Sequence, residues 1–184
     1  MSVNPLHTQV GGKYSNDDST VFQVKRRLQE CGFTVTHPLA DSIIADGDGT
    51  AFAFDPLIHS FKDVETDYYA SIRSCAFHTV ANLYHGAPYT GWSASLEVAY
   101  AMCFKRPLLV MAPLCPNDNV DDTIRKVVEI RSDKVRVLPE LLNHDPEIIK
   151  AQIQSVMAEE VDYGLTAREY SAVIDAVNDL ISSL

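Results

Sequence analysis

Apolar and polar positions along the first part of the chain change between the spacing of strands and that of a helix. Residues 8–12 form a short segment that opens into a polar, glycine-containing loop. Val21, Val24 and Leu28 then share one helical face, and residues 33–36 alternate between apolar and polar. The pattern therefore predicts a strand, a helix and a second strand. A right-handed crossover between the two strands would make them parallel.

The same succession of helix and strand continues toward the middle of the chain. Apolar residues recur with helical spacing over about 63–75, and a third strand is predicted over 77–83. A buried helix follows residue 91, and residues 107–113 form the continuous apolar run expected of a central parallel strand. These elements predict an α/β fold, with a flavodoxin-like or Rossmann-like parallel sheet flanked by helices and a C-terminal helical extension.

One domain spanning 1–184 is expected, with a core over about 8–113 and the helical extension over about 120–184. Two helices are predicted in the extension. Asp145 and Pro146 have the character of an N-cap and a first helical residue, and Thr166 with Glu169 matches a capping box. We interpret these helices as a cover or an oligomer contact.

Residues 38–62 are predicted to be a long, irregular segment of the kind that often forms a lid or binding loop. The sequence DGDG over 46–49 has part of the character of a calcium loop. It lacks the later ligands and the closing glutamate, so we interpret it as a solvated turn.

The net charge of −10 and the isoelectric point near 4.9 argue against binding to nucleic acid or to an anionic membrane surface. No apolar run is long enough to span a membrane, and the amino terminus lacks the pattern of a secretion signal. The four cysteines, at positions 31, 75, 103 and 115, have no metal-binding spacing. We therefore expect a cytoplasmic protein with buried thiols, without a metal or another cofactor.

Residues 91–101 place a carboxylate in an otherwise apolar helix. Gly91, Ser93 and Ser95 precede Glu97, and they can cap the helix or leave its first amides free for a ligand. In the first turn or so, the positive end of the helix would favour the ionised form of Glu97. An ionised carboxylate beside a cavity can act as a nucleophile or a base.

Residues 78–82 (HTVAN), 89–101 (YTGWSASLEVAYA) and 105–107 (KRP) resemble the signature of the nucleoside 2-deoxyribosyltransferase superfamily, and most of all its nucleotide N-glycosidase branch. In element order the similarity covers about 8–113. It implies that Glu97 attacks C1′ of a nucleoside or nucleotide, that the base leaves, and that water or a second base resolves the ribosyl-enzyme ester.

The resemblance also implies binding roles, each with a simpler structural alternative. Ser93 and Ser95 would bind a 5′-phosphate, or would only cap the helix. Members that act on free nucleosides tend to have an aspartate upstream of the nucleophile, where this chain has Gly91 and Trp92. This departure favours hydrolysis of a nucleotide over base exchange.

The segment Gly12, Lys13 and Tyr14 corresponds to the family's ligand loop, and its alternative is an ordinary solvated loop. Asp67, or else Glu65, would orient or protonate the base, and we favour Asp67 over an ordinary exposed carboxylate. His78 and His85 are interpreted as structural. The implied partners are a small-molecule nucleotide or nucleoside and further copies of the chain in a homo-oligomer.

A second resemblance remains open. Residues 14–18, with the helix ending near 28–33, resemble the start of TIR domains, some of which cleave NAD with a glutamate downstream of a tryptophan, as Glu97 is of Trp92. A third alternative is a nucleotide-sensing or interaction module without turnover. The small residues that follow Glu97 favour the first family.

Overall fold

The computed structural model describes residues 6–14, 19–47 and 50–184. Within these ranges five strands form one parallel sheet, in the order β2-β1-β5-β8-β9. The strands are β1 (His7–Gly12), β2 (Thr34–Val35), β5 (Phe77–Ala81), β8 (Leu108–Val110) and β9 (Arg136–Val137). Counted along the chain, this is the flavodoxin-like order 2-1-3-4-5. The predicted α/β class, with a parallel sheet flanked by helices, is confirmed.

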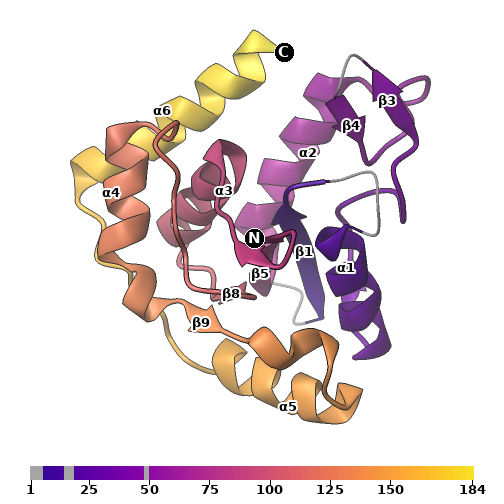
Figure 1. Ribbon diagram of the computed structural model, residues 1–184. Helices are drawn as coiled ribbons and strands as arrows, with labels where there is room; N and C mark the ends of the chain where they lie inside the picture. Colours follow the sequence, from indigo (N-terminus) through magenta and orange to yellow (C-terminus); the bar gives the residue numbers. More distant parts are fainter. Residues whose placement is uncertain (1–5, 15–18, 48–49) are drawn as a thin grey trace.

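Helices cover both faces of this sheet (Figure 1). One face carries α2 (Phe61–Ser74), α3 (Trp92–Cys103), α4 (Asp122–Ile130) and α6 (Ala167–Ser183), and the other carries α1 (Thr20–Glu30) and α5 (Pro146–Met157). Successive residues of β8 point to opposite faces: Leu108 and Val110 pack in the first core, and Leu109 in the second. This burial on both faces explains the apolar run in the sequence.

The helix starts follow the predicted capping chemistry in the C-terminal part. The capping box of Thr166 and Glu169 is formed at α6, and the Asp145 side chain accepts a hydrogen bond from the Glu147 amide at α5. At α1, Ser19 is the N-cap residue, but its hydroxyl donates to the Lys13 carbonyl instead of capping the helix. No helix in the described part of the chain is long and apolar enough to cross a membrane.

The segment over 38–62 contains more regular structure than its sequence predicts. Strands β3 (Ala45–Gly47) and β4 (Thr50–Phe52) form a short antiparallel hairpin. Asp48 and Gly49, part of the predicted solvated turn, lie outside the described residues. A second hairpin, of β6 (Leu83–Tyr84) and β7 (Ala87–Pro88), precedes α3.

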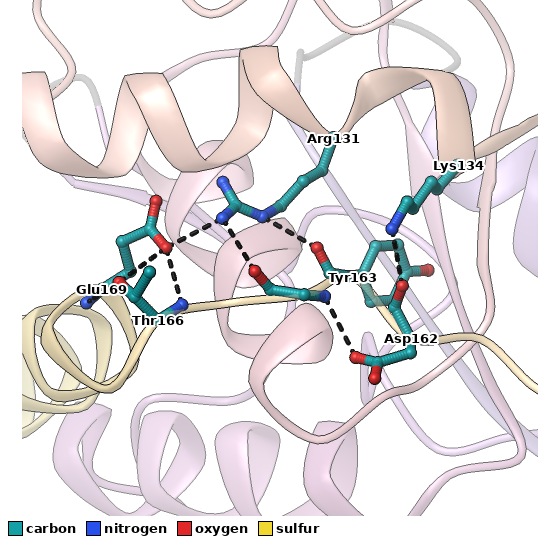
Figure 2. Close-up of polar contacts among 7 residues, drawn as sticks. Arg131, Lys134, Asp162, Tyr163, Thr166 and Glu169 are labelled. Atoms are coloured by element: carbon teal, nitrogen blue, oxygen red, sulfur yellow. Dashed lines mark hydrogen bonds and ion pairs between the residues drawn. The ribbon is translucent and has the colours of Figure 1, made fainter.

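The chain after residue 120 is joined to the sheet as well as covering it, because β9 pairs with β8. Two 3-10 helices, η1 (Ser132–Lys134) and η2 (Pro139–Leu142), flank β9. Figure 2 shows how the end of α4 holds the segment that leads into α6. The buried Arg131 guanidinium donates to the Tyr163 carbonyl over 3.0 Å and to the Glu169 carboxylate over 2.8 Å, and Lys134 donates to the Asp162 carbonyl over 2.7 Å. These contacts hold the segment before α6 in a fixed place against the end of α4.

Candidate active site

A cavity of about 400 Å³ lies beyond the carboxyl end of β1, between α2 and α3. Its described walls come from the loop after β1, from residues 37–39 and 53–54, and from inward-facing side chains of the two helices. In an open parallel sheet this is the edge at which ligands bind. Glu97 of α3 lines this cavity, so the fold brings the predicted nucleophile to the expected edge.

Both oxygens of the Glu97 carboxyl group are held by hydrogen bonds. The Tyr68 hydroxyl donates to Oε2 over 2.9 Å, and the Ser93 hydroxyl donates to Oε1 over 3.0 Å. Only 6% of the Glu97 surface is exposed. Two donors from different helices therefore fix one carboxyl group at the wall of the cavity.

Gly11 of β1 makes room for this arrangement. A Cβ atom on Gly11 would lie 1.8 Å from Glu97 Oε2 and 2.6 Å from the Tyr68 hydroxyl oxygen. Neither distance is compatible with van der Waals contact, so any side chain here would displace the carboxyl group or its donor. The glycine thus has a steric role that the sequence pattern did not reveal.

The helix end does not hold the pKa of Glu97 at its ordinary value. Burial raises the pKa of Glu97 to about 7, the Tyr68 and Ser93 hydrogen bonds lower it, and the charge of Glu65 raises it. Glu97 lies in the second turn of α3, and the effect of the helix dipole fades beyond the first turn. Removal of the carboxylate from water therefore outweighs the helix end.

This raised pKa gives a prediction for stability. The unfolded chain loses the Glu97 proton near pH 4.5, whereas the folded chain holds it to about 7. The carboxyl group should therefore lower the free energy of unfolding as pH rises between these values, by on the order of 3 kcal/mol. Urea unfolding of the wild type and Glu97→Gln at several pH values measures this, because Gln cannot ionise. Parallel pH profiles for the two proteins would contradict the assignment.

Two buried histidines lie close to the Tyr68 and Glu97 pair. His78 Nε2 is 3.8 Å from Glu97 Oε2, but burial lowers the pKa of His78 to about 3, so at neutral pH the two do not form an ion pair. His37 lines the cavity, and its ring meets the Tyr68 ring edge-on at 5.3 Å. Burial lowers the pKa of His37 to about 4. Both imidazoles are therefore neutral groups at neutral pH.

The predicted ligand loop lies at this cavity: Gly12, Lys13 and Tyr14 line it, as do Ser93 and Glu97. Gly91 is the N-cap residue of α3 and is not part of the described lining. Ser95 is fully buried away from the cavity, and its hydroxyl has no hydrogen-bond partner among the described residues. The geometry therefore gives Ser93, but not Ser95, access to a ligand.

The two acidic residues on α2 lie on different faces. Glu65 lines the cavity, and burial raises its pKa. Asp67 is exposed and does not belong to the described lining. The structure thus brings Glu65, rather than the favoured Asp67, to the cavity that Glu97 lines, because residues two apart on a helix point in different directions.

Two positioning residues were missed in the sequence. Lys25 is buried on α1, and its ammonium group donates to the carbonyls of Pro38 and Ala40 over 2.8 and 3.0 Å and pairs with Asp41 at 2.8 Å. These contacts hold the 37–39 wall of the cavity. A lysine on the same face as Val21 and Leu28 was the available signal.

Asn82, directly after β5, is the second missed residue. Its side-chain oxygen accepts from the amides of Met111 and Ala112, and its nitrogen donates to the Ala112 carbonyl over 2.7 Å. One amide side chain therefore ties together the ends of β5 and β8, near the edge of the sheet that carries the cavity. A buried amide at the end of an apolar strand was the available signal.

The chain was also compared with known proteins. No protein-family model matches it, and neither a curated protein nor a solved structure does. The case for function therefore depends on the geometry of this cavity and on the sequence motifs.

Proposed function

We propose that this protein cleaves the N-glycosidic bond of a nucleoside 5′-monophosphate or a (deoxy)nucleoside, with Glu97 as the nucleophile. The observation that carries the proposal is the Glu97 carboxyl group, buried but facing a cavity of about 400 Å³, with each oxygen held by one donor. A carboxyl group fixed in this way is oriented for attack on a sugar carbon.

The reaction follows the logic of retaining glycosidases. The Glu97 carboxylate attacks C1′, the electron pair of the C1′–N bond leaves with the base, and a ribosyl ester forms on Glu97. Water then attacks C1′ and releases the carboxylate. Glu65, in the same cavity, faces the leaving base, where a carboxyl group can hydrogen-bond to the base or protonate it.

Two features favour a mononucleotide as the substrate. Lys13 and Ser93 line the same cavity, and α3 starts at Gly91 with no side-chain cap and no acidic residue in its first turn. A helix start of this kind suits a phosphate group. The cavity volume lies near the lower end of the ligand-pocket range of roughly 300–1,000 Å³, which favours a mononucleotide over the larger NAD.

The direct test is incubation with a panel of nucleoside monophosphates, nucleosides and NAD, with free base followed by chromatography. We expect base release from a mononucleotide and, after acid quenching, a ribosyl adduct on the Glu97 peptide in mass spectra. Binding without release would support the non-catalytic module. Release from NAD alone would support the TIR-like alternative.

Tyr68→Phe should change the pH dependence of base release. The lost hydrogen bond lowers the pKa of Glu97 in the wild type, so its removal should shift the acid limb of kcat/KM upward by about one pH unit or more. Tyr69→Phe is the matched control, since the buried Tyr69 hydroxyl has no hydrogen-bond partner among the described residues. Equal shifts in both variants would argue against the Tyr68 contact.

We also propose a cytoplasmic homo-oligomer. All four cysteines, which lie in the described ranges, are free, as expected in a reducing compartment. Leu57 and Ile58, just before α2, are 94% and 72% exposed, an arrangement that self-association would relieve. Light scattering should show an oligomer at micromolar concentration and dissociation on Leu57→Glu. A monomer at every concentration would contradict this part of the proposal.

A further inference from the structure

The ionisable side chains around the cavity are mainly acidic. Among the described lining residues, Glu65 and Glu97 carry carboxyl groups and Lys13 carries the only ammonium group. Lys13 is exposed at the rim, where its Nζ lies 4.0 Å from the centre of the Tyr84 ring and 5.0 Å from that of Tyr89. His37 is neutral at neutral pH. The interior of the cavity therefore presents two carboxyl groups without a cation between them.

The walls around these carboxyl groups are rich in aromatic rings. Tyr14, Phe54, Phe61 and Tyr68 all line the cavity. The Phe54 and Phe61 rings meet edge-on at 5.5 Å. Aromatic faces attract cations, and the attraction grows when the cation is removed from water. Rings and carboxyl groups together are the chemistry of a site for an organic cation.

His37 contributes a further polar group. Its side chain is buried and lines the cavity, and its Nδ1 has no hydrogen-bond partner within the described ranges. A neutral imidazole can bind a polar substituent on a ligand ring without opposing a positive charge. The site therefore combines counter-charges, aromatic walls and one neutral hydrogen-bonding group.

We propose that the base cleaved by this protein carries a positive charge on its ring, as in N-glycosides of the pyridinium or N-alkylated purine class, and that Glu65 is its counter-charge. This inference rests on the proposed function and specifies its substrate class. The phosphate of such a mononucleotide would lie toward Lys13 and the start of α3.

A cationic base also simplifies the chemistry. When Glu97 attacks C1′, the electron pair of the C1′–N bond neutralises the ring nitrogen, so the base leaves without needing a proton. Water then forms the new C1′–O bond, the Glu97 carboxylate is released, and one proton passes to solvent. Glu65 is then not required to donate a proton to the leaving base. Its task is to stabilise the positive charge of the bound substrate.

Binding of free rings tests this without turnover. Calorimetric titration would compare 1-methylnicotinamide, whose methyl group stands for C1′, with neutral nicotinamide. We expect the cation to bind to the wild type about tenfold more tightly or better, and Glu65→Gln to remove most of this preference. Asp175→Asn, which removes one negative charge from an exposed position on α6, should keep the preference.

The outcomes separate this inference from the proposed function. Equal affinity for the two rings, tighter binding of the neutral ring, or no binding of either ring would overturn the inference. A preference that survives Glu65→Gln would overturn the role of Glu65. Base release from neutral nucleotides alone would leave the proposed function standing and overturn the cationic substrate class. Binding of the cation without any base release would overturn the proposed catalytic function and leave only a binding site for the cation.

Discussion

Glu97→Gln is expected to slow base release by about 10³-fold or more, because the amide that replaces the carboxylate cannot form the ribosyl ester. The amide oxygen can still accept a hydrogen bond from Tyr68, so the fold around the cavity should persist. Single-turnover release of base, with circular dichroism as the check on folding, measures this loss.

Chemical rescue distinguishes a nucleophile from a structural carboxyl group. Glu97→Ala opens space beside C1′, and added formate should restore part of the base release by taking the place of the missing carboxylate. The glycosyl formate made in this way should have inverted configuration at C1′ relative to the substrate, as the wild-type ribosyl ester does, because formate attacks from the same face as Glu97. Base release that persists in Glu97→Ala without formate would refute Glu97 as the nucleophile.

Gly11→Ala should reduce base release nearly as much as removal of Glu97, although Gly11 carries no functional group. The added Cβ would overlap Oε2 of Glu97 and crowd the Tyr68 hydroxyl, so the carboxyl group must leave its two donors. We expect a loss of about 10²-fold or more in kcat/KM, because small displacements of a reacting group are costly. Overpacking should also lower stability by roughly 1–3 kcal/mol.

Gly164→Ala provides the matched control for this loss. Gly164 has a φ of 65°, and a Cβ there would meet no atom within 4 Å. Alanine at this position strains the backbone and should cost about 1 kcal/mol of stability, far from the cavity. Base release should stay near the wild-type rate. Equal losses of activity in the two variants would indicate a general loss of stability and argue against a steric role for Gly11.

Much of the fold could be predicted because its signals are local. The apolar run that contains β8, the capping box at α6 and the buried face of α1 each follow from the neighbouring sequence. The β3–β4 hairpin and the pairing of β9 with β8 could not be predicted in the same way. These strands are two or three residues long, too short for periodicity to separate them from loops.

The sequence could predict the site residues that share one helix, but not those that come from other elements of the fold. Glu97 and Ser93 share one helix, so their spacing showed that they lie close together. Tyr68 and Gly11 come from other elements, and only the packing of α2 and β1 against α3 brings them to Glu97. The protonation of Glu97 could not be predicted from the helix position alone, since it depends on how much water the surrounding elements exclude.

The buried Lys25 limits how one wall of the cavity can move. The backbone at Pro38 and Ala40 is attached to α1 through one ammonium group, so this wall can shift only by breaking charged hydrogen bonds or by moving with the helix. The segment that carries Phe54 is joined to this wall, because the Ala40 amide donates a hydrogen bond to the Ala53 carbonyl over 2.8 Å. The wall held by Lys25 should therefore keep its shape when a substrate enters, because it moves as one body with α1.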